Sequence, residues 1–141
     1  MKKYLLLLLI IPIFSFSQNI SFQELYKNGG RADGRTYYKE SIFNGVVEYY
    51  YDNGTLKQTL PYKNGNYDGY SLYYEESGEL RNFVSYKNGE RDGKAYQFYK
   101  SGKLKRQITY KNGVRDGLYQ EFDNNGILTK SIRYKDGEII D

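Results

Sequence analysis

The stretch Tyr62-Lys63-Asn64-Gly65-Asn66-Tyr67-Asp68-Gly69 decides the fold, because its first four residues return at a fixed interval of 24 residues. The motif recurs at residues 86–89 and 110–113 and closes the series as Tyr134-Lys135-Asp136-Gly137. A fixed period of roughly 20 to 50 residues is typical of repeat proteins in which each unit contacts mainly its neighbours. We therefore expect a repeat domain with units at residues 38–61, 62–85, 86–109 and 110–133 and a stub at 134–141.

Each unit contains two groups of turn residues and two short strand-forming segments. In the unit at residues 62–85, the turn residues are Asn64 to Gly69 and Ser77-Gly78. Asn and Gly accept the positive φ angles that tight hairpin turns require. The segments between them are rich in aromatic and branched residues, which favour strands. The sequence therefore predicts an all-β fold, a single-layer, twisted antiparallel sheet of stacked 24-residue hairpins.

Alternation along a strand sorts the residues of each unit into two faces. Counted from the leading tyrosine as zero, the even positions are apolar, and we predict that they form one core face. The leading tyrosines form one row of this face. The other rows are Tyr50, Tyr74, Phe98 and Phe122; Leu56, Leu80, Leu104 and Leu128; and Leu60, Val84, Ile108 and Ile132. Odd positions late in each unit are mostly polar, which predicts a solvated face.

The N-terminus has the pattern of a secretory signal peptide over residues 1–17. Lys2 and Lys3 precede an apolar run from Leu5 to Phe14, and a small-x-small triplet ends at Ser17. We expect cleavage after Ser17 and export to the periplasm, the outer envelope or the extracellular space. Residues 18–37 depart from the repeat frame and are expected to form an N-terminal cap of one or two short strands.

Composition excludes several classes of function. Without Lys2 and Lys3, 19 basic and 17 acidic residues remain, and they are interspersed, which argues against nucleic acid as a partner. The chain has no cysteine, so it has no disulfides. It also has no histidine, and the lack of both residue types excludes thiol catalysis, Ser-His catalysis and the usual zinc sites.

Carboxylates are the remaining candidates for chemistry. Asp68, Asp92 and Asp116 recur in the same turn of each unit, which favours a structural role as turn formers over a glycosidase pair. Calcium sites at residues 52–54 or 123–126 are the weaker interpretation, because calcium takes roughly six to eight oxygen ligands and these turns offer few. We predict no catalytic, cofactor or metal site, and a protein that is not an enzyme.

Aromatic residues at odd positions form the candidate binding face. They are Tyr49, Tyr51, Tyr73, Phe83, Tyr99 and Tyr119. Tyrosine offers a large contact area with one polar tip and is common where proteins bind other proteins, peptides or glycans. The alternative is that these rings only stabilise the sheet through cross-strand pairs.

Units of the form Tyr-Lys-Asn-Gly-x-x-Asp-Gly, followed by an aromatic pair and Gly-x-Leu, resemble the MORN-repeat variant of bacterial proteins called the YwqK-type antitoxin family. The resemblance covers about residues 33–141. It implies a MORN-like sheet and a role in protein scaffolding or at membrane lipids, and the antitoxin label implies a partner toxin.

The predicted function is an exported, non-enzymatic repeat scaffold that binds another protein through its sheet face or edge. The alternatives are an antitoxin or immunity-type protein that neutralises a toxin, and a module that binds envelope glycans or a membrane surface. An open sheet edge would bind a partner by strand addition.

Overall fold

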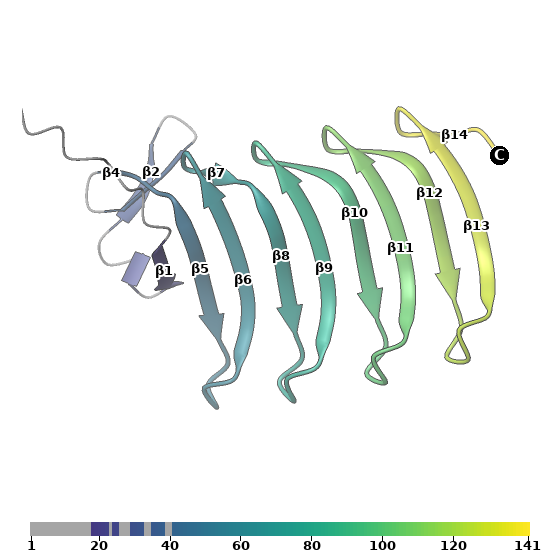
Figure 1. Ribbon diagram of the computed structural model, residues 1–141, viewed down its shortest axis with the longest axis horizontal. Helices are drawn as coiled ribbons and strands as arrows, with labels where there is room; N and C mark the ends of the chain where they lie inside the picture. Colours follow the sequence, from purple (N-terminus) through teal and green to yellow (C-terminus); the bar gives the residue numbers. More distant parts are fainter. Residues whose placement is uncertain (1–17, 23, 26–28, 33–34, 39–40) are drawn as a thin grey trace, which may run out of the picture.

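The computed structural model describes residues 18–22, 24–25, 29–32, 35–38 and 41–141. They form one open sheet of successive hairpins and a small second sheet near the N-terminus (Figure 1). The large sheet has eleven strands in the order β1-β5-β6-β8-β9-β10-β11-β12-β13-β14, with β7 paired to β6. The predicted all-β single-layer sheet of stacked hairpins is confirmed. The predicted signal peptide lies outside the described residues.

The strand bounds follow the 24-residue period. The large sheet contains β1 (Gln18–Ser21), β5 (Gly45–Tyr50), β6 (Leu56–Lys63), β7 (Asn66–Tyr67), β8 (Gly69–Tyr74), β9 (Leu80–Lys87), β10 (Glu90–Phe98), β11 (Leu104–Lys111), β12 (Val114–Phe122), β13 (Leu128–Lys135) and β14 (Glu138–Ile139). The small sheet contains β2 (Gly29–Ala32), β3 (Arg35–Tyr38) and β4 (Ser41–Ile42).

From residue 62 onward, both turns of each unit lie where the sequence predicts them. At Asn64 and Gly65 the φ angles are 51° and 75°, and the later copies repeat this pair of positive values. Two positive φ angles define the type I′ turn, whose twist matches that of the strands it joins. The opposite turn is closed by backbone hydrogen bonds such as Tyr51 N–H to Thr55 C=O at 2.9 Å.

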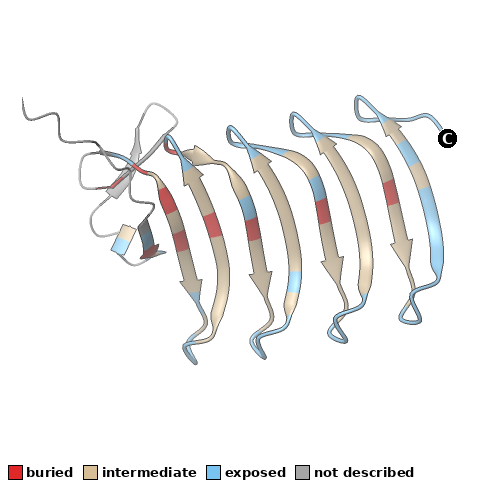
Figure 2. Cartoon of the chain, in the orientation of Figure 1, coloured by how far each residue is buried: buried red, intermediate tan, exposed pale blue. Residues whose placement is uncertain are grey.

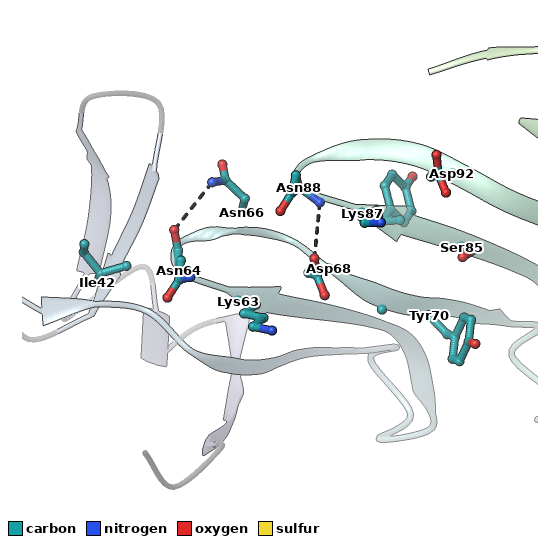
Figure 3. Close-up of a pocket in the computed structure, with 12 residues that line it drawn as sticks. Ile42, Lys63, Asn64, Asn66, Asp68, Tyr70, Ser85, Lys87, Asn88 and Asp92 are labelled. Atoms are coloured by element: carbon teal, nitrogen blue, oxygen red, sulfur yellow. Dashed lines mark hydrogen bonds between the residues drawn. The ribbon is translucent and has the colours of Figure 1, made fainter. Parts of the chain in front are cut away.

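Each Asn-Gly turn is bound to the unit before it. Asn88 N–H donates to Asp68 Oδ2 at 3.2 Å (Figure 3), and Gly89 N–H donates to the Tyr67 carbonyl at 2.7 Å. We call this pair of bonds the inter-unit clamp. It recurs from Asn112 to Asp92 with Gly113 to the Arg91 carbonyl, and from Asp136 to Asp116 with Gly137 to the Arg115 carbonyl. The recurring aspartates therefore hold the next unit's turn.

The first unit uses an amide in place of the aspartate. Asn44 Oδ1 accepts the Asn64 N–H at 2.8 Å, and the Phe43 carbonyl accepts the Gly65 N–H at 2.9 Å. The clamp therefore needs a side-chain oxygen at this position and no negative charge.

The strand register corrects the predicted face assignment. Val47 pairs with Leu60, and Tyr49 pairs with Gln58, so odd positions of the first strand share a face with even positions of the second. The register then shifts at a bulge, and Tyr50 pairs with Leu56 on the other side of the sheet. Parity holds along a single strand and is lost across a turn and a bulge. The single even-numbered core face was wrong.

Two faces can be defined from the register. The core face carries a middle row of Val47, Leu60, Ser71, Val84, Ala95, Ile108, Tyr119 and Ile132. The reverse face carries the aromatic and leucine rows on either side of each bulge, Tyr50, Tyr74, Phe98 and Phe122 with Leu56, Leu80, Leu104 and Leu128. It also carries Tyr70, Phe83 and Tyr96, whose rings contact one another in series.

Burial is concentrated at the N-terminal end of the sheet (Figure 2). Val47 is fully buried and Phe43 is 2% exposed, and both belong to a cluster with Ile20, Tyr38 and Leu60. The N-terminal segment contributes to this cluster, since Ile20 belongs to it and Leu25 packs against it. The first hairpin thus has its core face covered by the chain itself.

The two edges of the sheet end differently. Strand β1 pairs with β5 in parallel, which is the one parallel pairing among the described strands. At the other edge β14 pairs with β13 only at Tyr134 and Lys135, so Leu128 remains 46% exposed. The stub at residues 134–141 thus ends in the short edge strand β14. In the part of the chain that the structure describes, no helix is long and apolar enough to span a membrane.

The clamp predicts a specific pattern of stability. Replacing Asp92 by Ala removes the acceptor for the Asn112 N–H and should lower the free energy of unfolding by about 0.5–2 kcal/mol, as loss of a helix N-cap does. Asp92→Asn, which installs the residue found at Asn44, should keep most of that stability. Urea unfolding of the three proteins tests this, and equal losses in both variants would contradict the clamp.

Burial predicts a gradient of leucine contributions. Leu60, at 9% exposed, lies in the N-terminal cluster, and Leu60→Ala should destabilise the protein by about 2–5 kcal/mol. Leu128→Ala, at 46% exposed, should cost well under half as much. Thermal or urea unfolding measures both, and equal effects would show that the stability is spread evenly along the sheet.

Candidate binding surface

A groove of about 370 Å³ lies on the core face over β8 to β11. Its floor is the middle row, where Ser71 and Ala95 present small side chains that are 6% and 8% exposed. One side is lined by Tyr73, Asn82, Gln97 and Arg106, and the other by Tyr86, Arg91 and Tyr110. The groove therefore combines an apolar floor with amide, phenol and guanidinium groups.

The position in the repeat unit that Ser71 and Ala95 occupy determines where the groove begins and ends. Val47 holds this position in the first unit and lies in the cluster that the N-terminal segment helps to form. Ser71 and Ala95 hold it in the next two units, and Tyr119 fills it in the fourth with a ring that is 8% exposed. The groove exists where the side chain at this position is small.

Rings and guanidinium groups form a ladder along one side of the core face. Tyr62, Tyr67 and Tyr86 follow each other with ring centroids 4.8 Å and 5.4 Å apart. In the next units the partners are cations, because Arg91 Cζ lies 5.4 Å from the Tyr110 ring and Arg115 Cζ lies 5.2 Å from the Tyr134 ring. The ladder thus changes from aromatic to cationic along the sheet.

The arginines of the ladder are held by hydrogen bonds as well as by stacking. Arg115 Nη1 donates to the Tyr134 hydroxyl at 3.1 Å, and Arg91 Nη1 donates to the Tyr110 hydroxyl at 3.4 Å. A hydrogen bond to Tyr86 raises the pKa of Arg91, and the bond to Tyr134 raises that of Arg115. Both groups are therefore fixed, charged and exposed.

Three cations surround the ring of Tyr119. Arg106 and Arg115 lie 5.6 Å and Lys130 lies 5.9 Å from its centroid. Glu121 is the acid of this group, and it accepts hydrogen bonds from the Tyr119 hydroxyl and, at 3.0 Å, from Arg106 Nη2. Burial raises the pKa of Tyr119, and the bond from Tyr119 lowers the pKa of Glu121, with Arg106 acting in the same direction.

The six predicted binding residues do not share one surface. Tyr49, Tyr73 and Tyr119 lie on the core face, and Phe83 lies on the reverse face. Of the core-face set, Tyr49 stacks on Phe22 at 4.7 Å and Tyr119 is buried, which leaves Tyr73 beside the groove.

Tyr51 and Tyr99 tie units together. Their hydroxyls donate to the carbonyls of Tyr74 and Phe122 in the following unit, each at 2.8 Å. The neighbouring hydroxyl of Tyr73 raises the pKa of Tyr51 to about 12. A binding role for the six residues stays a prediction, and the structure does not support one continuous aromatic face.

Sequence reasoning missed the cations of the core face, Arg91, Arg106, Arg115 and Lys130. They occupy two positions in the unit that are neutral in the earlier copies, where Tyr67 stands in place of Arg91 and Asn82 in place of Arg106. Their charges are separated along the chain and meet only when strands pair. Comparing the copies position by position would have found them.

The carboxylates of the turns have structural partners. Asp68 and Asp92 line a polar hollow of about 820 Å³ near the Asn-Gly turns. Each accepts the backbone N–H of the next turn, and Figure 3 shows the bond from Asn88 to Asp68. Asp123 Oδ1 accepts the backbone N–H groups of Asn125 and Ile127, which lowers its pKa. Within the described residues, no three acidic, histidine or cysteine side chains group into a metal site.

The fold and surface define a β-hairpin repeat protein with an open, partly covered sheet. Three of its segments match the MORN repeat variant, at residues 43–64, 91–112 and 115–136. Each match begins at the residue whose carbonyl accepts the glycine N–H of a clamp and ends at the asparagine or aspartate just before that glycine, so it includes both residues of the clamp's side-chain bond. MORN repeats form non-catalytic scaffolds and are commonly modules that bind proteins or membranes. No curated protein and no solved structure matched the chain significantly.

The Glu121 contacts predict a pH-dependent contribution to stability. Because the folded pKa of Glu121 is lowered from its ordinary value of 4.5, its contribution is present above about pH 4.5 and is lost as the pH falls through the lowered value. Glu121→Gln keeps the acceptor oxygen but lacks the charge. Its melting temperature should fall below that of the native chain at pH 6, and the gap should narrow at pH 3. A gap that stays constant would contradict this role.

Proposed function

We propose that this chain is an exported, non-enzymatic repeat protein that binds a segment of another protein in the groove over β8 to β11. The observation that carries the proposal is the groove itself, a stretch of core face left uncovered between the N-terminal cluster and Tyr119. A sheet face with an apolar row is normally covered. A segment of partner chain would cover it here.

The chain supplies its own example of how the core face binds a segment. Ile20 and Leu25 of the N-terminal segment pack with Val47 and Leu60, and Phe22 stacks on Tyr49. The groove continues the same face, with Ser71 and Ala95 leaving room for side chains of a second segment. Asn82 and Gln97 offer donors and acceptors to its backbone.

Export is supported by the N-terminal sequence. The apolar run from Leu5 to Phe14 follows two lysines and precedes a small-x-small triplet. Cleavage after Ser17 would make Gln18 the first residue of the mature chain, and Gln18 begins β1. The partner would therefore be met in the envelope or outside the cell.

Site-specific photo-cross-linking in the native cell tests the proposal. A benzophenone amino acid at Tyr73, beside the groove, should give a discrete adduct with a protein in the exported fraction. The same group at Phe83 is the matched control, because the two residues are aromatic, belong to one hairpin and lie on opposite faces. Ala95→Tyr, which installs the residue that the fold accepts at Tyr119, should fill the groove and abolish the adduct.

Other outcomes would contradict the proposal. Equal adducts from both faces, or adducts at Tyr73 with glycan or lipid alone, would argue for the envelope-binding alternative. An adduct confined to the cytoplasm with the uncleaved chain would contradict export. A toxin as the cross-linked partner would give the groove the neutralising role that the resemblance to antitoxins implies.

A further inference from the structure

Four cations gather on the core face beside and beyond the groove. Arg91 and Arg106 line the groove, and Arg115 and Lys130 continue the group around the ring of Tyr119. Glu121 is the one carboxylate within salt-bridge distance of any of these four among the described residues, and it is 3.0 Å from Arg106. The group, which we call the cationic cluster, therefore has a large excess of positive charge.

The cationic cluster is preorganised to bind an anion. Arg91 and Arg115 are each stacked on a tyrosine ring and hydrogen-bonded to its hydroxyl, so little conformational entropy remains to be lost on binding. Arg106 Nε is buried and has no hydrogen-bond partner among the residues that the structure describes. A guanidinium group donates in a fork that matches a carboxylate.

The spacing of the cluster suits an extended segment. Arg91 and Arg115 hold the same position in successive units, which are two strands and therefore roughly 10 Å apart. In an extended polyproline II segment, which has three residues per turn and a rise of about 3.1 Å per residue, carboxylates three residues apart lie on the same side and are separated by roughly 9 Å. Such a chain could also place intervening side chains on the apolar floor at Ala95 and Ile108.

We propose that the groove and the cationic cluster bind an acidic segment of the partner protein, with glutamate or aspartate side chains on Arg91 and Arg115 and smaller side chains on the groove floor. This inference rests on the function proposed for the groove and adds the chemistry of its partner. A flat anionic surface would meet the rim arginines but would leave the recessed floor at Ser71 and Ala95 empty. The apolar floor therefore favours a polypeptide over a membrane.

The probe is a fluorescein-labelled dodecapeptide, (Glu-Ser-Val)4, compared with (Lys-Ser-Val)4 by fluorescence anisotropy at low ionic strength. The native chain should bind the acidic peptide and not the basic one. Arg91→Tyr combined with Arg115→Tyr installs the residue that the fold accepts at Tyr67, and it should weaken binding about tenfold, as expected for two exposed ion pairs. Binding by the native chain should also weaken as salt rises.

A matched control removes the same charge from the other face. Strand alternation places Lys94 and Lys111 on the reverse face, and Lys94→Gln with Lys111→Gln should leave the affinity within about twofold of the native value. If both double variants weakened peptide binding equally, the affinity would depend only on the net charge of the protein, and the proposal would be overturned. So would equal binding of the two peptides, or binding to phosphatidylglycerol vesicles without binding to the acidic peptide.

The failure of this inference can be separated from failure of the proposed function. If the Tyr73 cross-link to a protein persists while the arginine variant binds (Glu-Ser-Val)4 unchanged, the groove binds protein and the acidic partner is wrong. If Ala95→Tyr leaves the Tyr73 adduct intact, the groove is not the binding surface. If Ala95→Tyr leaves the adduct intact and the arginine variant still binds the acidic peptide more weakly, the arginines bind an acidic ligand outside the groove. That result would overturn the proposal that the groove and the cationic cluster form one site.

Discussion

The inter-unit clamp is the interaction on which the rest of this structure depends. In a type I′ turn the central residues sit at positive φ, and here both of their backbone N–H groups point to the preceding unit. A side-chain oxygen takes one donor and a carbonyl takes the other. A single hairpin is marginal in water. The clamp couples each hairpin to its predecessor, and one inserted residue between Asp68 and Asn88 would misplace both acceptors. The strict 24-residue period follows from this geometry.

The clamp also gives the sheet a direction. Every unit depends on the unit before it, so the first needs a different origin of stability. That origin is the cluster of Ile20, Tyr38, Phe43, Val47 and Leu60, in which the N-terminal residues replace a preceding repeat. Farther along, burial falls and β13 is largely exposed. The N-terminal cluster stabilises the first unit, and each clamp couples the following unit to the one before it. The residues on the faces of the later units can therefore vary.

The architecture could be predicted from the sequence because local sequence motifs that repeat determine it. Asn-Gly fixes the turn, and a period of 24 residues fixes the stacking. The faces could not be predicted by parity alone, because the hairpin pairs odd positions of its first strand with even positions of its second, which leaves Tyr50 on the reverse face, and the bulge opposite Tyr50 brings Leu56 to the same face. The cationic cluster was equally hidden, since Arg91 reaches the ring of Tyr110, and Lys130 that of Tyr119, only after the strands pair. The aspartates were rightly taken as structural, although their partner is the next turn.

What changes between copies is therefore more informative about binding than what repeats. The position held by Val47, Ser71, Ala95 and Tyr119 sets where the core face is filled and where it is open. The positions that change from Tyr67 to Arg91, and from Asn82 to Arg106, set where the face becomes positive. None of these positions takes part in the clamp through its side chain, so each can change without breaking the clamp. A groove beside a cluster of cations is the combination that these variable positions produce, and it lies on units that the clamps join to one another.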